Sequence, residues 1–147
     1  MINKFETHRY KLEYIEANPY ESDHVLFFIH GFLGTKETWD KVTRLLGINH
    51  HYITIDLPVC GNSTNISDYS YTCSEIAETL YELVEHLNLK SIILVGHGSG
   101  AVVASMLYEH ISSYVIGMTL LCPGFHMQPV NKFQHIPRCM VDYFAGK

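Results

Sequence analysis

The sequence predicts an α/β fold whose central sheet is mostly parallel and carries helices on both faces. Short, unbroken apolar runs recur along the chain, and such runs are typical of strands that are covered on both sides. Segments with the apolar spacing of amphipathic helices alternate with these runs. Strands that alternate with helices require right-handed crossovers and therefore produce a parallel sheet. The 147 residues, 47% of them hydrophobic, are enough for one domain with its own core.

The first 19 residues are expected to form antiparallel strands at one edge of the sheet. The stretch KFETHRYKLEYIEAN mixes aromatic and charged residues in near alternation, which favours such strands, and Asn18-Pro19 closes it as a turn. HVLFFIHG then predicts a buried parallel strand that ends in glycine. KETWDKVTRLL predicts a helix that Gly47 ends, with four apolar residues on one side: Trp39, Val42, Leu45 and Leu46.

The second half of the chain continues the alternation. HYITIDLP predicts a strand that Pro58 ends, and the polar stretch VCGNSTNISDYS predicts a loop. A capping-box pair, Thr72 and Glu75, marks the start of a long helix with apolar residues at helical spacing. SIILVG predicts a buried strand, SGAVVASMLYEH a helix of small residues that can pack close to a sheet, and YVIGMTLLCPG a further strand.

Composition and charge exclude several classes of function. The net charge of −5 without a basic cluster argues against nucleic acid as a partner, and no apolar run reaches the length of a membrane span. The N-terminus lacks the apolar stretch of a secretory signal, and the four cysteines form no C-x-x-C pair, so we expect a cytoplasmic protein with reduced thiols. The ten histidines are scattered without the spacing of metal ligands, and we therefore expect neither a metal nor a cofactor.

Three motifs stand at the C-terminal ends of successive predicted strands. HGFLG follows the first buried strand, DLPVCGNS the second and VGHGSGA the third. In this order they resemble the α/β-hydrolase family, and the resemblance runs from about residue 25 to residue 123. Within that family the chain is similar to the menaquinone-pathway synthase that eliminates pyruvate and to small carboxylesterases. The resemblance implies a single, partial domain over residues 1–147 that is truncated before the family's last strands. Residues 125–147 would then be the start of a lid or a tail that folds back on the sheet.

The resemblance also implies a site for a small acyl or ester ligand. The backbone N–H of Phe32 would donate one hydrogen bond to the substrate carbonyl, and the N–H of Ser99 would donate the second. Such donors stabilise the negative charge that develops on the carbonyl oxygen in the transition state. His30, Gly31 and His97 would line the same site.

The nucleophile position itself lacks a reactive side chain. The elbow motif is G-x-S-x-G, in which the two glycines make room for a sharp strand-to-helix turn. Gly96 and Gly100 are the flanking pair in this chain, so Gly98 stands where the family has serine. A register shifted to Ser99 would put His97 at the near flank, where its side chain would crowd the turn. We therefore expect Ser99 to begin the following helix and to cap it, with a displaced nucleophile at Ser99 as the alternative.

The sequence does not supply clear partners for a catalytic serine either. In the family the acid and the histidine follow the nucleophile along the chain. The downstream candidates here are His126, His135 and Asp142, which stand where the family begins its lid. The synthase branch has an arginine four residues after the nucleophile, where this chain has Val102. Cys60 stands in the second motif without a base placed to activate it.

These observations lead to one favoured hypothesis for function and two alternatives. The favoured one is a protein of acyl or ester hydrolase descent that is catalytically impaired because Gly98 replaces the elbow serine and the acid and histidine are absent downstream. The alternatives are an active hydrolase or pyruvate-eliminating lyase that uses Ser99, and a non-catalytic fragment that binds a small molecule or a partner. The last predicted strand, apolar on both faces, would be an open edge, which predicts self-association or pairing with a complementing C-terminal fragment.

Overall fold

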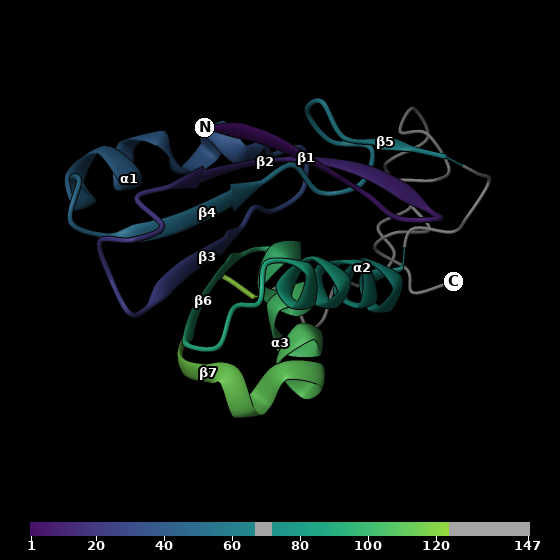
Figure 1. Cartoon of the computed structure of the whole chain (residues 1–147). Helices are drawn as coiled ribbons and strands as arrows, with labels where there is room; N and C mark the ends of the chain where they lie inside the picture. The colour runs from purple at the N-terminus through teal and green to yellow at the C-terminus, as the bar shows by residue number, and fades with distance from the viewer. Residues whose placement is uncertain (67–71, 124–147) are drawn as a thin grey trace.

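The computed structural model describes residues 1–66 and 72–123, which form one mixed sheet with helices packed against it (Figure 1). The strands in chain order are β1 (Ile2–Glu6), β2 (Tyr10–Ala17), β3 (Val25–Ile29), β4 (His51–Ile55), β5 (Thr64–Asn65), β6 (Ile92–His97) and β7 (Val115–Leu121). The helices are the 3₁₀ helix η1 (Lys36–Trp39), α1 (Asp40–Leu46), α2 (Cys73–His86), α3 (Ser99–Ile111) and the 3₁₀ helix η2 (Ser112–Tyr114). The predicted tail, with His126, His135 and Asp142, lies outside the described residues.

Parallel strands form the centre of the sheet, and the N-terminal strands extend it in the antiparallel sense. The order across the sheet is β1-β2-β4-β3-β6-β7, with β5 paired to β2 outside this path. β3 pairs in parallel with both β4 and β6, and β6 pairs in parallel with β7. β2 runs antiparallel to β1, β4 and β5. The mostly parallel α/β sheet predicted from the sequence is therefore confirmed.

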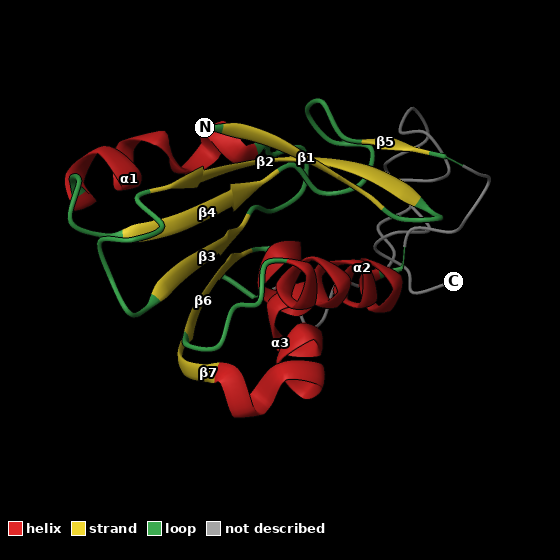
Figure 2. Ribbon diagram, in the orientation of Figure 1, coloured by secondary structure: helices red, strands yellow, loops and turns green. Residues whose placement is uncertain are grey.

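Different helices cover the two faces of the sheet (Figure 2). α2 and α3 pack on one face, where they enclose the main core together with alternate residues of the central strands, among them Phe27, Ile29 and Ile53. The intervening residue Phe28 points to the opposite face and contacts Trp39 of η1, with the ring centroids 4.9 Å apart. Burial of such apolar side chains, which contributes about 25 cal/mol per Å² of apolar surface, is the main stabilising contribution to the fold.

The sequence signals hold for α2 but only in part for the helix before β4. The capping box is confirmed, because Thr72 Oγ1 accepts a hydrogen bond from Glu75 N–H at 3.2 Å and Glu75 Oε2 accepts one from Thr72 N–H at 3.1 Å. The predicted apolar side of the earlier helix is right for Trp39, which is buried, and for Leu46, which is half-buried. It is wrong for Val42 and Leu45, which are exposed, whereas Thr43 is buried. That segment starts as a 3₁₀ turn, which has fewer residues per turn than an α-helix and so shifts the side that faces the sheet.

The three motifs lie side by side at one end of the sheet. β4, β3 and β6 are consecutive neighbours and run in parallel, so the loops that follow them emerge at the same edge. On the far side of β6, β7 ends the described sheet and has Ile116, Met118 and Leu121 exposed. The topology therefore gathers sequence segments from three different places at one edge of the sheet.

Candidate active-site elbow

The turn between β6 and α3 has the sharp strand-to-helix geometry of a nucleophile elbow. Its central residue, Gly98, has φ 57° and ψ −121° and is the last non-helical residue before α3. The Gly98 N–H donates a hydrogen bond to the carbonyl oxygen of Leu121 at the end of β7, at 2.9 Å. A positive φ of this kind strains residues with side chains, whereas glycine adopts it without that strain.

The two flanking glycines are required by close backbone packing. A β-carbon at Gly96 would lie 2.6 Å from an α-carbon of α3, and one at Gly100 would collide with the carbonyl oxygen of His30. At Gly98, by contrast, the one contact of a β-carbon with the described residues would be with the α-carbon of Gly31, at 3.7 Å, which is an ordinary distance. The described residues therefore leave room for a side chain at position 98, and among them the backbone conformation is what favours glycine.

Ser99 is the first residue of α3, and its predicted role as helix cap is wrong because Gly98 occupies the N-cap position. Ser99 is 7% exposed, and its Oγ is buried without a hydrogen-bond partner among the described residues. A hydroxyl that attacks a carbonyl must reach the substrate and needs an adjacent base. Burial and the lack of a partner in the described part of the chain are both unfavourable for a displaced nucleophile. The Ser99 N–H belongs to the first helical turn, whose N–H groups have no intrahelical partner.

His30 supports the loop after β3 from inside the protein. It is fully buried, its Nε2 accepts a hydrogen bond from Leu57 N–H at 3.0 Å, and its Nδ1 lies 2.8 Å from Gly31 O. Because Nε2 accepts, the proton of the neutral ring is on Nδ1, which donates to Gly31 O. Burial lowers the pKa of His30 and favours this neutral form. Both ring nitrogens bond to backbone, so in this arrangement neither is presented to a ligand.

Gly31 allows the loop after β3 to approach the elbow closely. A β-carbon on Gly31 would lie 2.8 Å from the carbonyl oxygen of His97 and 3.0 Å from His97 Nδ1. Phe32, whose N–H was predicted to face a substrate, follows Gly31 and is 36% exposed. The fold therefore brings Gly31 and His97 together with Gly98, and it places Phe32 next to this group.

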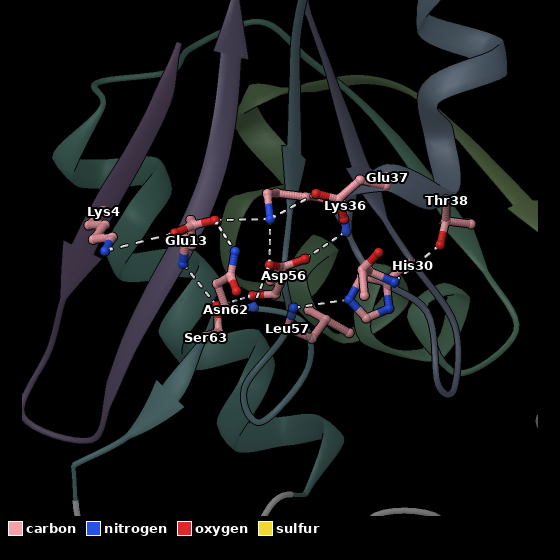
Figure 3. A network of polar contacts seen from close by, with 11 residues as sticks. Lys4, Glu13, His30, Lys36, Glu37, Thr38, Asp56, Leu57, Asn62 and Ser63 are labelled. Atoms are coloured by element: carbon pink, nitrogen blue, oxygen red, sulfur yellow. Dashed lines mark hydrogen bonds and ion pairs between the residues drawn. The ribbon is translucent and has the colours of Figure 1, made fainter.

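A buried ionic cluster lies beside the same loop, and sequence analysis missed it (Figure 3). Lys36, with its side chain 2% exposed, places Nζ 2.8 Å from Asp56 Oδ2, 3.0 Å from Glu13 Oε1 and 3.0 Å from Glu37 Oε1. The Lys36 backbone N–H also donates to Asp56 Oδ1 at 2.7 Å. We call these four residues, together with Asn62, the Lys36 cluster. The one sequence signal that could have indicated it is Asp56, a charged residue directly after an apolar strand.

Further hydrogen bonds satisfy the carboxylates of the Lys36 cluster. Asn62 donates from its backbone N–H to Asp56 Oδ2 at 2.9 Å and from its side chain to Glu13 Oε1 at 2.7 Å. The bonds from Asn62 and Lys36 lower the pKa of Glu13. Burial disfavours the charge on Lys36, but its bonds to Asp56 and the two glutamates outweigh burial and raise its pKa. Gly61, at φ 53°, lets the chain turn around Asp56, since a β-carbon there would collide with the carboxylate.

The other candidates for chemistry in the described residues are unfavourably placed. Burial, with a smaller effect of the Asp56 charge, raises the pKa of the Cys60 thiol to about 11, so it is protonated and weakly nucleophilic at neutral pH. Val102 is a half-buried apolar residue of α3.

Within residues 1–66 and 72–123, no three His, Cys, Asp or Glu side chains are grouped as a metal ion would require. In the same part of the chain, no helix combines the length and apolar character needed to cross a bilayer.

Comparisons with known proteins agree with this geometry. A family model described as alpha/beta hydrolase fold matches residues 24–147. The chain is 32% identical over 106 residues to the uncharacterized hydrolase YugF of Bacillus subtilis, a match that covers 70% of this chain and 38% of YugF. It is 29% identical over 109 residues to monoacylglycerol lipase abhd6-B of Xenopus laevis, which covers 72% of this chain and 32% of the lipase. The chain thus spans well under half the length of either relative.

Solved structures show the same fold at lower sequence identity. A hydrolase from Pseudomonas aeruginosa PA01 superposes with a TM-score of 0.77 at 19% identity, over 87% of this chain and 48% of the hydrolase. Est816, an N-acyl homoserine lactone degrading enzyme, superposes with a TM-score of 0.74 at 23% identity, over 83% of this chain and 46% of Est816. At these identities the similarity is one of fold.

Proposed function

The chain belongs to the α/β-hydrolase family, and on this premise we propose that it descends from acyl or ester hydrolases and is itself catalytically impaired. The observation that carries the proposal is Gly98, which has the φ and ψ of a sharp elbow and no side chain to attack a carbonyl. Covalent catalysis in this family begins when an activated hydroxyl at the elbow adds to the carbonyl carbon. Without that hydroxyl the acyl-enzyme intermediate does not form.

We propose that the site still binds the carbonyl group of a small acyl or ester ligand. The N–H groups of Phe32 and Ser99 come from the two backbone segments that meet at Gly31 and Gly98. Donors of this kind hold a carbonyl oxygen, and they stabilise its developing charge only when a nucleophile attacks. Binding without turnover is therefore the expected behaviour.

Labelling and turnover measurements on the full chain test the impairment. A fluorophosphonate probe reacts with activated serine hydroxyls, and we expect no labelling of this chain. With p-nitrophenyl acetate we expect hydrolysis at the rate of a heat-denatured sample, while an active esterase serves as the positive control. Labelling at Ser99 that the variant Ser99→Ala abolishes, with circular dichroism unchanged, would overturn the proposal.

A pair of variants at position 98 tests whether the nucleophile is the only missing part. The elbow has room for a β-carbon there, so both Gly98→Ser and Gly98→Ala fit sterically. If an acid and a base are in place, Gly98→Ser gains probe labelling and Gly98→Ala does not. If the acid and base are missing as well, neither variant is labelled.

A further inference from the structure

We propose that Lys36 and Asp56 act as positioning residues for the loop that faces the elbow. This loop consists of residues 31–35, which we call the arch, and it lies between His30 and Lys36. The pair holds the arch so that the Phe32 N–H points in one fixed direction. That a ligand meets this N–H rests on the proposed function, whereas the fixing of its direction does not.

Both ends of the arch are anchored on two consecutive residues of the chain. At its start, His30 Nε2 accepts a hydrogen bond from Leu57 N–H at 3.0 Å. At its end, the Lys36 N–H donates to Asp56 Oδ1 at 2.7 Å, and Lys36 Nζ lies 2.8 Å from Asp56 Oδ2. One carboxylate therefore holds Lys36 by its backbone and by its side chain. Residues 31–35 therefore form a short loop whose two ends are held at adjacent positions, Asp56 and Leu57.

Within the arch, the carbonyl oxygen of Gly31 is held by two donors. His30 Nδ1–H donates to it at 2.8 Å, and Gly34 N–H donates to it at 3.0 Å. The peptide bond between Gly31 and Phe32 is trans, and in a trans peptide the C=O and N–H lie in one plane and point in opposite directions. Fixing the Gly31 carbonyl therefore fixes the Phe32 N–H in the opposite direction.

The charges of the cluster make this anchor stiff. Lys36 is buried with carboxylates from three segments around it: Glu13 from β2, Glu37 from η1 and Asp56 after β4. Charge-assisted hydrogen bonds are shorter and stronger than neutral ones, and their strength increases as water is excluded. Glu37 belongs to η1 like Lys36 and moves with it, so moving Lys36, and with it the end of the arch, would break the bonds to Glu13 and Asp56 together.

Amide hydrogen exchange, followed for single residues by NMR on the full chain, tests the proposal without any ligand. The double variant Lys36→Met/Asp56→Asn removes both charges of the pair. We expect the Gly34 and Leu57 amides to exchange at least about tenfold faster relative to the Leu94 amide in β6. A merely structural role would accelerate all amides together, so a smaller rise in this ratio would overturn the proposal.

A matched control uses a lysine of an exposed ion pair. Lys11→Met removes the pair with Glu6, whose charged atoms are 3.1 Å apart on the outer strands. We expect the ratio of exchange rates to stay as in the unmodified chain. A rise equal to that of the double variant would show that the arch responds to any loss of charge, and would overturn the assignment to Lys36 and Asp56.

A measurement on the unmodified chain covers the case in which the double variant does not fold. In low concentrations of urea, the amides of Gly34, Lys36 and Leu57 should open with one common free energy and one urea dependence, distinct from those of Leu94. Three unrelated opening free energies would overturn the proposal. Labelling at Ser99, or failure of an ester to bind, would contradict the proposed function and leave these exchange results unaffected.

Discussion

The elbow and the Lys36 cluster both adjoin the arch, but they differ in whether their polar side chains have partners. In the cluster, Lys36 Nζ lies within 3.0 Å of three carboxylates, and Asn62 donates two further hydrogen bonds. At the elbow, Gly98 carries no side chain, and Ser99 Oγ is buried without a partner in the described part of the chain. Each charged side chain of the first region has an oppositely charged partner, whereas position 98 in the second region has no side chain.

The contrast indicates that the packing that supports such a site and the side chain at its centre can vary independently. Removal of one buried charge leaves its partners uncompensated, so a substitution in the cluster lowers the stability of the fold. Loss of a side chain at position 98 is not opposed in this way, because glycine relieves the strain of a positive φ. A glycine at position 98 is therefore compatible with the sharp turn between β6 and α3.

The largest expected effect is that of Lys36→Met on stability. Asp56 and Glu13 would lose their shared buried cation, and breaking a buried pair in this way lowers the free energy of unfolding by about 3–5 kcal/mol. Urea denaturation followed by circular dichroism measures the change. The control Lys11→Met breaks an exposed pair and should cost about 1 kcal/mol or less. Equal losses in the two variants would remove the contrast between the cluster and ordinary surface charges.

Alanine substitutions of two elbow glycines should come next and differ from each other. Gly100→Ala should cost about 3 kcal/mol or more, because its β-carbon would collide with backbone carbonyl oxygens that cannot move independently. Gly98→Ala should cost about 1–2 kcal/mol, since there is room for the methyl group and only the backbone conformation opposes it. Thermal unfolding of both variants in parallel checks the order. A larger loss for Gly98→Ala would contradict the packing described for the flanks.

Acid should weaken the Lys36 cluster by a smaller amount and in a defined direction. The pKa of Glu13 is lowered from its ordinary value of 4.5, so its contribution to stability is present above pH 4.5 and is lost as the pH falls through the lowered pKa. The pKa of Lys36 is raised from 10.5, so its contribution is complete below pH 10.5 and is lost only as the pH rises further.

Glu13→Gln should therefore flatten the acid limb of a plot of unfolding free energy against pH. The alkaline limb should keep its downward direction, because Lys36 retains Asp56 as a partner. Urea denaturation at a series of pH values provides the plot. An acid limb as steep as that of the unmodified chain would show that groups other than Glu13 cause the acid sensitivity.

The smallest effect is expected for Ser99→Ala. The Ser99 hydroxyl is buried without a partner among the described residues, so its removal relieves a desolvation penalty and leaves only a one-atom void. We expect the free energy of unfolding to change by about 1 kcal/mol or less, in the direction of higher stability. A clear loss of stability in the denaturation curve would indicate a hydrogen bond from Ser99 that the described residues do not contain.

Predictions from the sequence succeeded where the signal is local. The central strands followed from unbroken apolar runs, and α2 followed from a capping box whose two members are three residues apart. Two predictions about helix details failed. The predicted buried side was wrong for Val42 and Leu45 because a 3₁₀ turn precedes α1. The cap at Ser99 was wrong because Gly98 holds the N-cap position, which leaves Ser99 inside the helix.

Sequence patterns alone account for the order of the strands and helices, except for β5, which lies in the stretch predicted to be a loop. They also account for the three motifs after the central strands and for the absence of a side chain at position 98. The contacts of Lys36 with Glu13 and Asp56, and the backbone hydrogen bonds of the buried His30, became visible only in the folded chain. The two kinds of information differ in how far along the chain they act. Apolar periodicity and φ preferences act within a few residues, whereas the partners of a buried charge depend on which strands the fold places side by side, here β2 next to β4 and β4 next to β3.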